Sequence, residues 1–223
     1  MNRFWVVTGV LALCALVIGA AVAFSSARKA TAFSFIPPVS ESGAPGEGLC
    51  SQCHTGGVNL AGGSLEIQNV PASYTPGQTY SITVQLERAG QSRWGFQLVP
   101  IRDSLQHKVM AGWLTAVSNT TIVSSNFVDT GPRAYASHYS GETNGTFAGT
   151  LDGPVSWTFN WTAPVAAGAG TVTFYCAGNA ANGNSLPGGG DVIYTATATS
   201  NEAPATDAVT TTTWGKIKAL YLK

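Results

Sequence analysis

The sequence has little charge. Asp, Glu, Lys and Arg make up only 10% of its 223 residues, and the two signs balance at 11 each. Arg3, Arg28 and Lys29 lie in or just after an N-terminal apolar run, so the body of the chain is mildly acidic. A nucleic-acid-binding protein needs a basic surface that displaces counterions from phosphates. The composition therefore argues against nucleic acid as a partner.

Cysteine is scarce as well. Cys14 lies in the apolar run, Cys50 and Cys53 lie close together, and Cys176 stands alone. Four cysteines so placed exclude an extended disulfide framework. Hydrophobic residues nevertheless make up 44% of the chain and aromatic residues 10%. Because this is ample material for a core, we expect one folded domain of ordinary size rather than a disordered chain.

Residues 1–32 are typical of an export signal. Asn2-Arg3 is a short positive segment, and the uncharged run from Phe4 to Phe24 follows it. Ala21-Val22-Ala23 fits the small-x-small cleavage pattern, with Ala30-Thr31-Ala32 as a second candidate. The same run is long enough to remain as a membrane anchor. Either interpretation places the rest of the chain outside the cytoplasm, in the periplasm, at the cell surface or in the medium.

The pattern beyond the leader indicates strands. Residues 33–63 are rich in Gly and Pro and predict an irregular segment. Residues 64–200 carry alternating apolar and polar positions, which predict an all-β, immunoglobulin-like antiparallel β-sandwich. Residues 201–223 are a Thr-rich linker and an amphipathic tail. The Gly- and Asn-rich stretch 178–190 is interpreted as a flexible connection, with a binding loop as the alternative. The expected strands are 64–70, 79–86, 94–101, 155–161, 171–176 and 192–198, with weaker candidates at 109–118 and 121–127.

The segment Cys50-Ser-Gln-Cys53-His54 carries the chemistry. C-x-x-C-H is the attachment signature of c-type haem. Two thiols at this spacing add to the two vinyl groups on one porphyrin edge, and His54 then lies under the iron as its proximal ligand. A redox dithiol is the first alternative, but it belongs near a βαβ pattern that this sequence does not contain. Half a zinc site is the second, and it needs two further ligands. We predict one covalent haem c.

The second axial ligand of the iron has three candidates: His138, His107 and Met110. His138 lies in an aromatic, nearly uncharged segment suited to covering a porphyrin edge, whereas His107 lies in a polar stretch. The alternative for His138 is a solvated loop residue, which is the usual position of a lone histidine. Two imidazole ligands leave no open iron position, which favours electron transfer over oxygen chemistry.

Several further motifs match a known group of domains. Together with the segment from Gly43 to His54, they resemble bacterial Reeler-like domains, also called choice-of-anchor V, that carry an N-terminal haem-binding motif. The resemblance implies an immunoglobulin-like sandwich on a secreted or surface protein, and it aligns a family histidine with His138. Cys176 stands where the resemblance leads us to expect a small residue. The matching motifs are Tyr74-Thr-Pro-Gly-Gln-Thr-Tyr80, Gly95-Phe-Gln-Leu98, Trp157-Thr-Phe-Asn-Trp-Thr-Ala-Pro164, Phe174-Tyr-Cys-Ala-Gly-Asn-Ala-Ala-Asn182, Gly190-Asp-Val-Ile-Tyr194 and the terminal Trp214-Gly-Lys-Ile-Lys218.

These observations predict an exported monohaem c-type cytochrome, an electron carrier rather than an enzyme. Its expected partners are other redox proteins, a multisubunit electron-transfer complex or a haem-bearing assembly. The N-terminal run or the amphipathic tail Trp214–Lys223 can also attach it to a membrane or surface. Two alternatives stay open: a structural or adhesive surface module with haem in a secondary role, and a haem enzyme or gas sensor with five-coordinate iron.

Overall fold

The computed structural model of the chain describes residues 33–103, 108–127, 131–141, 144–204 and 218. The predicted leader 1–32, the ligand candidate His107 and nearly all of the tail Trp214–Lys223 lie outside these residues. Among the described residues, none of the helices has the length and apolar character needed to cross a bilayer.

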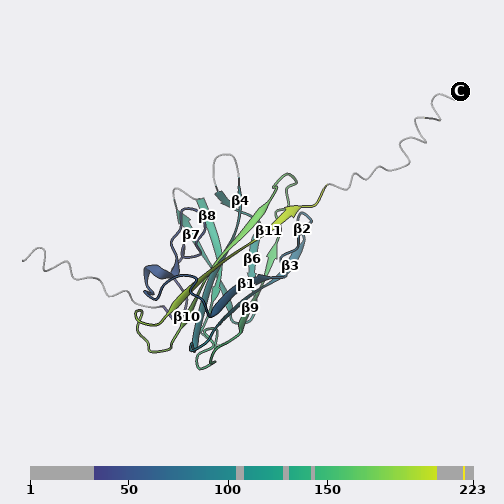
Figure 1. Cartoon of the computed structure of the whole chain (residues 1–223). Helices are drawn as coiled ribbons and strands as arrows, with labels where there is room; N and C mark the ends of the chain where they lie inside the picture. The colour runs from purple at the N-terminus through teal and green to yellow at the C-terminus, as the bar shows by residue number, and fades with distance from the viewer. Residues whose placement is uncertain (1–32, 104–107, 128–130, 142–143, 205–217, 219–223) are drawn as a thin grey trace, which may run out of the picture. The chain divides into compact units, whose positions relative to one another are not determined.

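The described residues form two β-sheets (Figure 1). One has the strand order β1-β3-β9-β6, and the other has the order β2-β11-β10-β4-β8-β7 with β5 paired to β4. A short 3-10 turn, η1, precedes them at the cysteine motif. The bounds are η1 (Cys50–Gln52), β1 (Gly63–Gln68), β2 (Ser73–Tyr74), β3 (Thr79–Arg88), β4 (Arg93–Asp103), β5 (Lys108–Met110), β6 (Trp113–Ala116), β7 (Thr120–Phe127), β8 (Gly131–His138), β9 (Val155–Thr162), β10 (Val172–Ala181) and β11 (Val192–Glu202).

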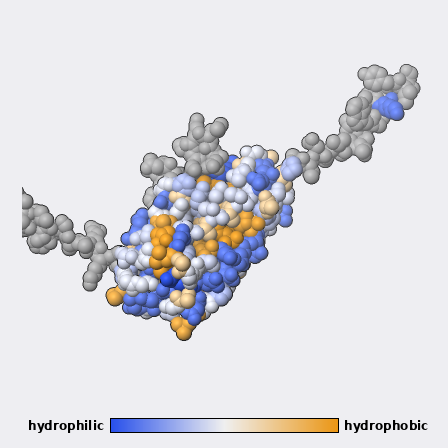
Figure 2. All heavy atoms as spheres, in the orientation of Figure 1, coloured by the Kyte–Doolittle hydropathy of each residue, from blue (hydrophilic) through white to orange (hydrophobic). Residues whose placement is uncertain are grey.

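The core lies between the two sheets. Alternation along β9 buries Trp157 and Trp161 on one face, as its sequence predicts. Trp157 packs on Phe96 of β4 at a ring distance of 4.8 Å, and Trp161 packs on Phe174 of β10 at 4.9 Å. Aromatic pairs at these distances contribute beyond the area that they bury. The predicted all-β sandwich is therefore confirmed. The face shown in Figure 2 carries separate apolar patches among hydrophilic residues.

The strand pattern differs from the prediction in four places, of which β8 is described below. The β2–β11 pair is parallel, so the sandwich is not wholly antiparallel. The weak candidate 109–118 splits into β5 and β6, which belong to different sheets. Gly112 makes this crossing possible because its φ is 73° and an added Cβ would lie 2.1 Å from Thr162 O. The third difference is β10, which runs to Ala181 and shortens the expected connection 178–190.

Strand β8 was not predicted, and it changes the position of His138. The expectation was a loop residue, either over a porphyrin edge or in solvent. His138 is instead the last residue of β8 and is 5% exposed. The solvated-loop alternative is therefore wrong for this residue.

Candidate functional site

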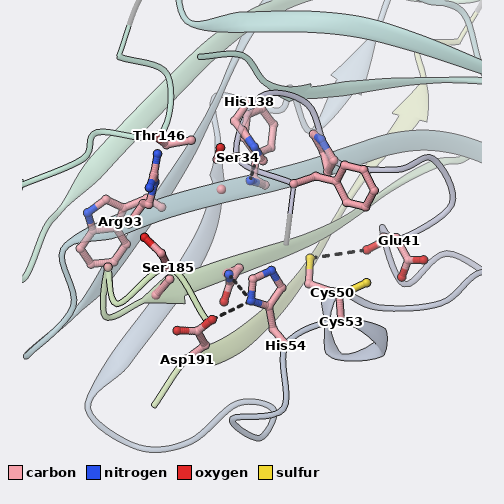
Figure 3. Close-up of a pocket in the computed structure, with 18 of the residues that line it drawn as sticks. Ser34, Glu41, Cys50, Cys53, His54, Arg93, His138, Thr146, Ser185 and Asp191 are labelled. Carbon is pink, nitrogen blue, oxygen red and sulfur yellow. Dashed lines mark hydrogen bonds and ion pairs between the residues drawn. The ribbon is translucent and has the colours of Figure 1, made fainter. Parts of the chain in front are cut away.

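A pocket brings together parts of the chain that lie far apart in the sequence (Figure 3). Its walls come from segment 33–54, the start of β4, the end of β8 and the connection between β10 and β11. Cys50, Cys53, His54 and His138 all line it. Met110 is not among the lining residues, and its sulfur accepts a hydrogen bond from the Ala134 N–H at 3.1 Å.

A buried ion pair fixes the segment that carries the motif to the sheet. Arg133 of β8 donates to Glu47 Oε1 at 2.5 Å, and the two side chains are 0% and 1% exposed. Tyr135 OH donates to the same carboxylate oxygen at 2.7 Å, and Ser42 Oγ donates to Oε2 at 2.5 Å. Ala44 of the same segment packs in a small second cluster with residues of β4 and β8. The cysteine motif therefore follows a segment anchored at several points.

Gln97 of β4 adds a second anchor. Its side-chain oxygen accepts the Glu41 N–H at 2.8 Å, and its Nε2 donates to Pro38 O at 2.8 Å. Gln97 alternates along β4 with the core residues Phe96 and Leu98, so it lies on the outer face of the larger sheet. The motif segment therefore covers one part of this outer face.

Asp191 orients His54. His54 Nδ1 donates to Asp191 Oδ2 at 2.6 Å, and the Asn182 N–H donates to Oδ1 at 3.2 Å. Asn179 Nδ2 also lies 3.1 Å from His54 Nδ1. A carboxylate on Nδ1 fixes the tautomer and leaves the lone pair on Nε2 for a metal. The close approach of the motif segment to Asp191 requires a glycine at position 56, because an added Cβ on Gly56 would lie 1.1 Å from the Asp191 carbonyl oxygen.

Sequence reasoning missed this partner. Asp191 is 2% exposed, yet it follows the stretch that was interpreted as a flexible connection. Gly183, Ser185 and Leu186 of that stretch line the pocket, so it forms part of the wall. The available signal was the Gly190-Asp-Val-Ile-Tyr194 motif, whose single acid directly precedes the apolar start of a strand.

His138 faces the pocket from the opposite side. The β4–β8 ladder ends at Gln97–Ser137, and the next free N–H, that of Phe96, donates to His138 Nδ1 at 3.2 Å. His138 Nε2 is buried with no hydrogen-bond partner. The ring lies against Gly95, where an added Cβ would be 2.8 Å from both Cε1 and Nδ1. Burial above all lowers the pKa of His138 to about 4, so the imidazole is neutral at pH 7.

The Phe96 bond has a chemical consequence. Because Nδ1 accepts it, the proton of the neutral ring lies on Nε2, which is a buried donor without an acceptor. Coordination of a metal through Nε2 therefore requires the His138 ring to give up the Phe96 bond.

Cys50, Cys53 and Cys176 are free thiols. Burial, followed by the nearby Glu41 carboxylate, raises the pKa of Cys50 to about 12, and the same two causes raise the pKa of Cys53. A reactive redox dithiol has a lowered pKa. The environment therefore does not favour the dithiol alternative. Cys176 lies in the sandwich core, where burial raises its pKa, as expected for a buried free thiol.

The residues present fit a haem. Two free thiols, the oriented Nε2 of His54 and the unpartnered Nε2 of His138 surround one pocket. Apolar residues complete its lining, namely Phe33, Pro37, Pro38, Trp94, Phe96 and Leu186. Within the described residues, no group of three His, Cys, Asp or Glu side chains could hold a metal ion by itself.

Fold and pocket define a β-sandwich domain with a C-x-x-C-H segment docked on the outer face of its larger sheet. No protein-family model matches the chain, and no curated protein matches it. Among solved structures, the human F-spondin reeler domain is similar at 20% identity and a TM-score of 0.40, covering 67% of this chain and 96% of that one. A cohesin module from Clostridium perfringens is similar at 12% identity and a TM-score of 0.39, covering 65% of this chain and 100% of that one. These likenesses are too distant to place the chain in a family.

Proposed function

We propose that this protein is an exported monohaem c-type cytochrome that carries electrons between redox partners outside the cytoplasm. One observation carries the proposal: the two motif cysteines, His54 and the buried His138 line a single pocket. Haem in this pocket supplies a reversible one-electron change at its iron.

Each residue has a distinct task in this proposal. Cys50 and Cys53 would hold the cofactor covalently, and His54, oriented by Asp191, would bind its iron. His138 would supply the second iron ligand. A haem held in this way would have no open iron position, which favours electron transfer over enzymatic oxygen chemistry. Its partners are then other redox proteins, a multisubunit complex or a haem-bearing assembly.

The first test is the visible spectrum of the protein made in a host that matures c-type haem. We expect one covalent haem per chain, seen as a haem-stained band at the mature mass on a denaturing gel. Cys50→Ala with Cys53→Ala is the matched control and should abolish the band. A colourless wild-type band from such a host contradicts the proposal.

The second test concerns His138. His138→Ala should turn low-spin haem into high-spin haem and create carbon monoxide binding in the ferrous protein, because it opens one axial position. Met110→Ala and His107→Ala are the controls and should change neither property. If His138→Ala keeps the low-spin spectrum, His138 is not the ligand, and the control variant that does change the spectrum identifies it.

A structural or adhesive surface module is the second candidate. The observation that favours it is a core that does not depend on the pocket: Trp157, Trp161 and Phe159 pack between the sheets, whereas the motif segment lies on the outer face. The sandwich can thus fold and serve as a module without a cofactor. Absence of covalent haem from the first test would favour this candidate.

A further inference from the structure

Arg93 is the cation of the pocket. It is the first residue of β4, and its backbone pairs with Ala181 of β10. The side chain lines the pocket, and its Nε is buried without a hydrogen-bond partner. Within the described part of the chain, the ion pairs are His54–Asp191 and Arg133–Glu47, so no carboxylate there pairs with Arg93.

The charges of the pocket are separated. Figure 3 shows Arg93 at the end beside Thr146 and Ser185, while Cys50 and Cys53 lie at the other end beside Glu41. The remaining acid of the pocket, Asp191, is held by His54. The cysteine end therefore carries a carboxyl group and the opposite end a guanidinium. The buried Nε–H of Arg93 has no acceptor, so the Arg93 end is suited to binding an anion.

We propose that Arg93 binds the propionate carboxylates of the haem and thereby sets its orientation; this inference rests on the proposed function. The vinyl and propionate groups of haem lie on opposite edges of the porphyrin. Attachment at Cys50 and Cys53 directs the propionates away from the cysteine end, toward the end where Arg93 lies. The reverse orientation would bring the carboxylates beside Glu41, which repels them when it is ionised, and away from Arg93. The covalent and electrostatic constraints thus select the same orientation.

Arginine suits this task. Its planar guanidinium forms two parallel hydrogen bonds to a carboxylate, which fixes direction as well as charge. A hydrogen bond to a charged group contributes enough that we expect free-acid haem to be preferred over its dimethyl ester by roughly 10- to 100-fold. Esterification removes the propionate charge and leaves the rest of the porphyrin unchanged.

The experiment measures haem binding without covalent attachment. The full chain with Cys50→Ala and Cys53→Ala is titrated with haem and with haem dimethyl ester, and the ratio of dissociation constants is compared after Arg93→Gln and Arg93→Lys. We expect Arg93→Gln to remove the preference for the free acid and Arg93→Lys to retain part of it. Arg102→Gln, on the same strand but outside the pocket, is the matched control and should leave the ratio unchanged.

The covalently loaded protein provides a second readout. Arg93→Gln should lower its reduction potential, because a positive charge near the iron favours the reduced form, whereas Arg102→Gln should not. A preference that survives Arg93→Gln, or one lost equally with Arg102→Gln, overturns the inference while the proposed function stands. If neither porphyrin binds and the wild-type protein takes up no covalent haem, the proposed function itself fails.

Discussion

The Glu47–Arg133 pair should decide whether the motif segment stays on the sheet. Both side chains are almost fully buried, 2.5 Å apart, and Arg133 also lies 3.3 Å from Pro45 O. Glu47→Gln keeps the shape of the side chain but leaves the Arg133 charge without its carboxylate. Removing one partner of a buried pair costs about 3–5 kcal/mol. A domain is typically stable by only about 5–15 kcal/mol, so the loss is a large part of the total.

Urea unfolding followed by tryptophan fluorescence measures this effect. A double-mutant cycle separates the pair from its surroundings: Glu47→Gln, Arg133→Met and both together. Because replacing a whole buried pair by apolar groups is often close to neutral, the double variant should lose much less stability than the two single variants combined. Glu66→Gln, at an exposed residue of β1, is the control and should change the free energy of unfolding by at most about 0.5 kcal/mol.

Two outcomes would refute this reasoning. One is a Glu47→Gln variant that unfolds within about 1 kcal/mol of wild type, which means that water or another group reaches the Arg133 charge. The other is simple additivity of the two single changes, which means that the side chains do not interact. In either case the segment from Ser42 to Glu47 is not fixed by this pair.

Three further predictions follow from the pocket. Asp191→Asn should raise the reduction potential of the haem-loaded protein, because a neutral amide makes His54 a weaker electron donor; an unchanged redox titration contradicts this role. Gly95→Ala should displace the His138 ring, because the new Cβ lies 2.8 Å from it, and carbon monoxide binding should show a partly opened iron. Glu41→Gln concerns pH, because burial, then Glu47, raises the pKa of the Glu41 carboxyl from 4.5 to about 7. Between these pH values the folded chain keeps a proton that the unfolded chain releases, so the free energy of unfolding falls as pH rises. Urea unfolding of haem-free protein at several pH values should show this fall for wild type and not for Glu41→Gln. The same pH dependence in both proteins refutes the prediction.

The sequence predicts the strands whose burial alternates. Val155–Thr162 buries every second residue against the facing sheet, and its apolar pattern shows this directly. Gly131–His138 could not be recognised in the same way, because both of its faces are covered and its buried residues include Arg133 and Ser137. An arginine is buried there because Glu47 neutralises it from 86 residues away. The sequence around Arg133 therefore gives no indication that Glu47 is its partner.

The residues of the site also differ in whether the sequence reveals them. Cys50, Cys53 and His54 are contiguous, so their spacing alone indicates what they can hold. Asp191 lies 137 residues from His54, and in the sequence it is one acid beside a Gly-rich stretch. Its role follows only from the return of β10 and β11 beside the motif.

Because the chain has few charged residues, the partner of each buried acid or base shows which segments it holds together. Glu47 neutralises Arg133 and holds the motif segment on the sheet, and Asp191 holds the ring of His54. Each of these charges has a partner and a clear structural consequence. Arg93 lines the same pocket partly exposed, and its buried Nε–H has no acceptor. An anion that enters with the bound group would supply that acceptor, which is the reason for our inference about the propionates. In a chain with so few charges, the position of Arg93 indicates the end of the pocket at which we infer that carboxylates bind.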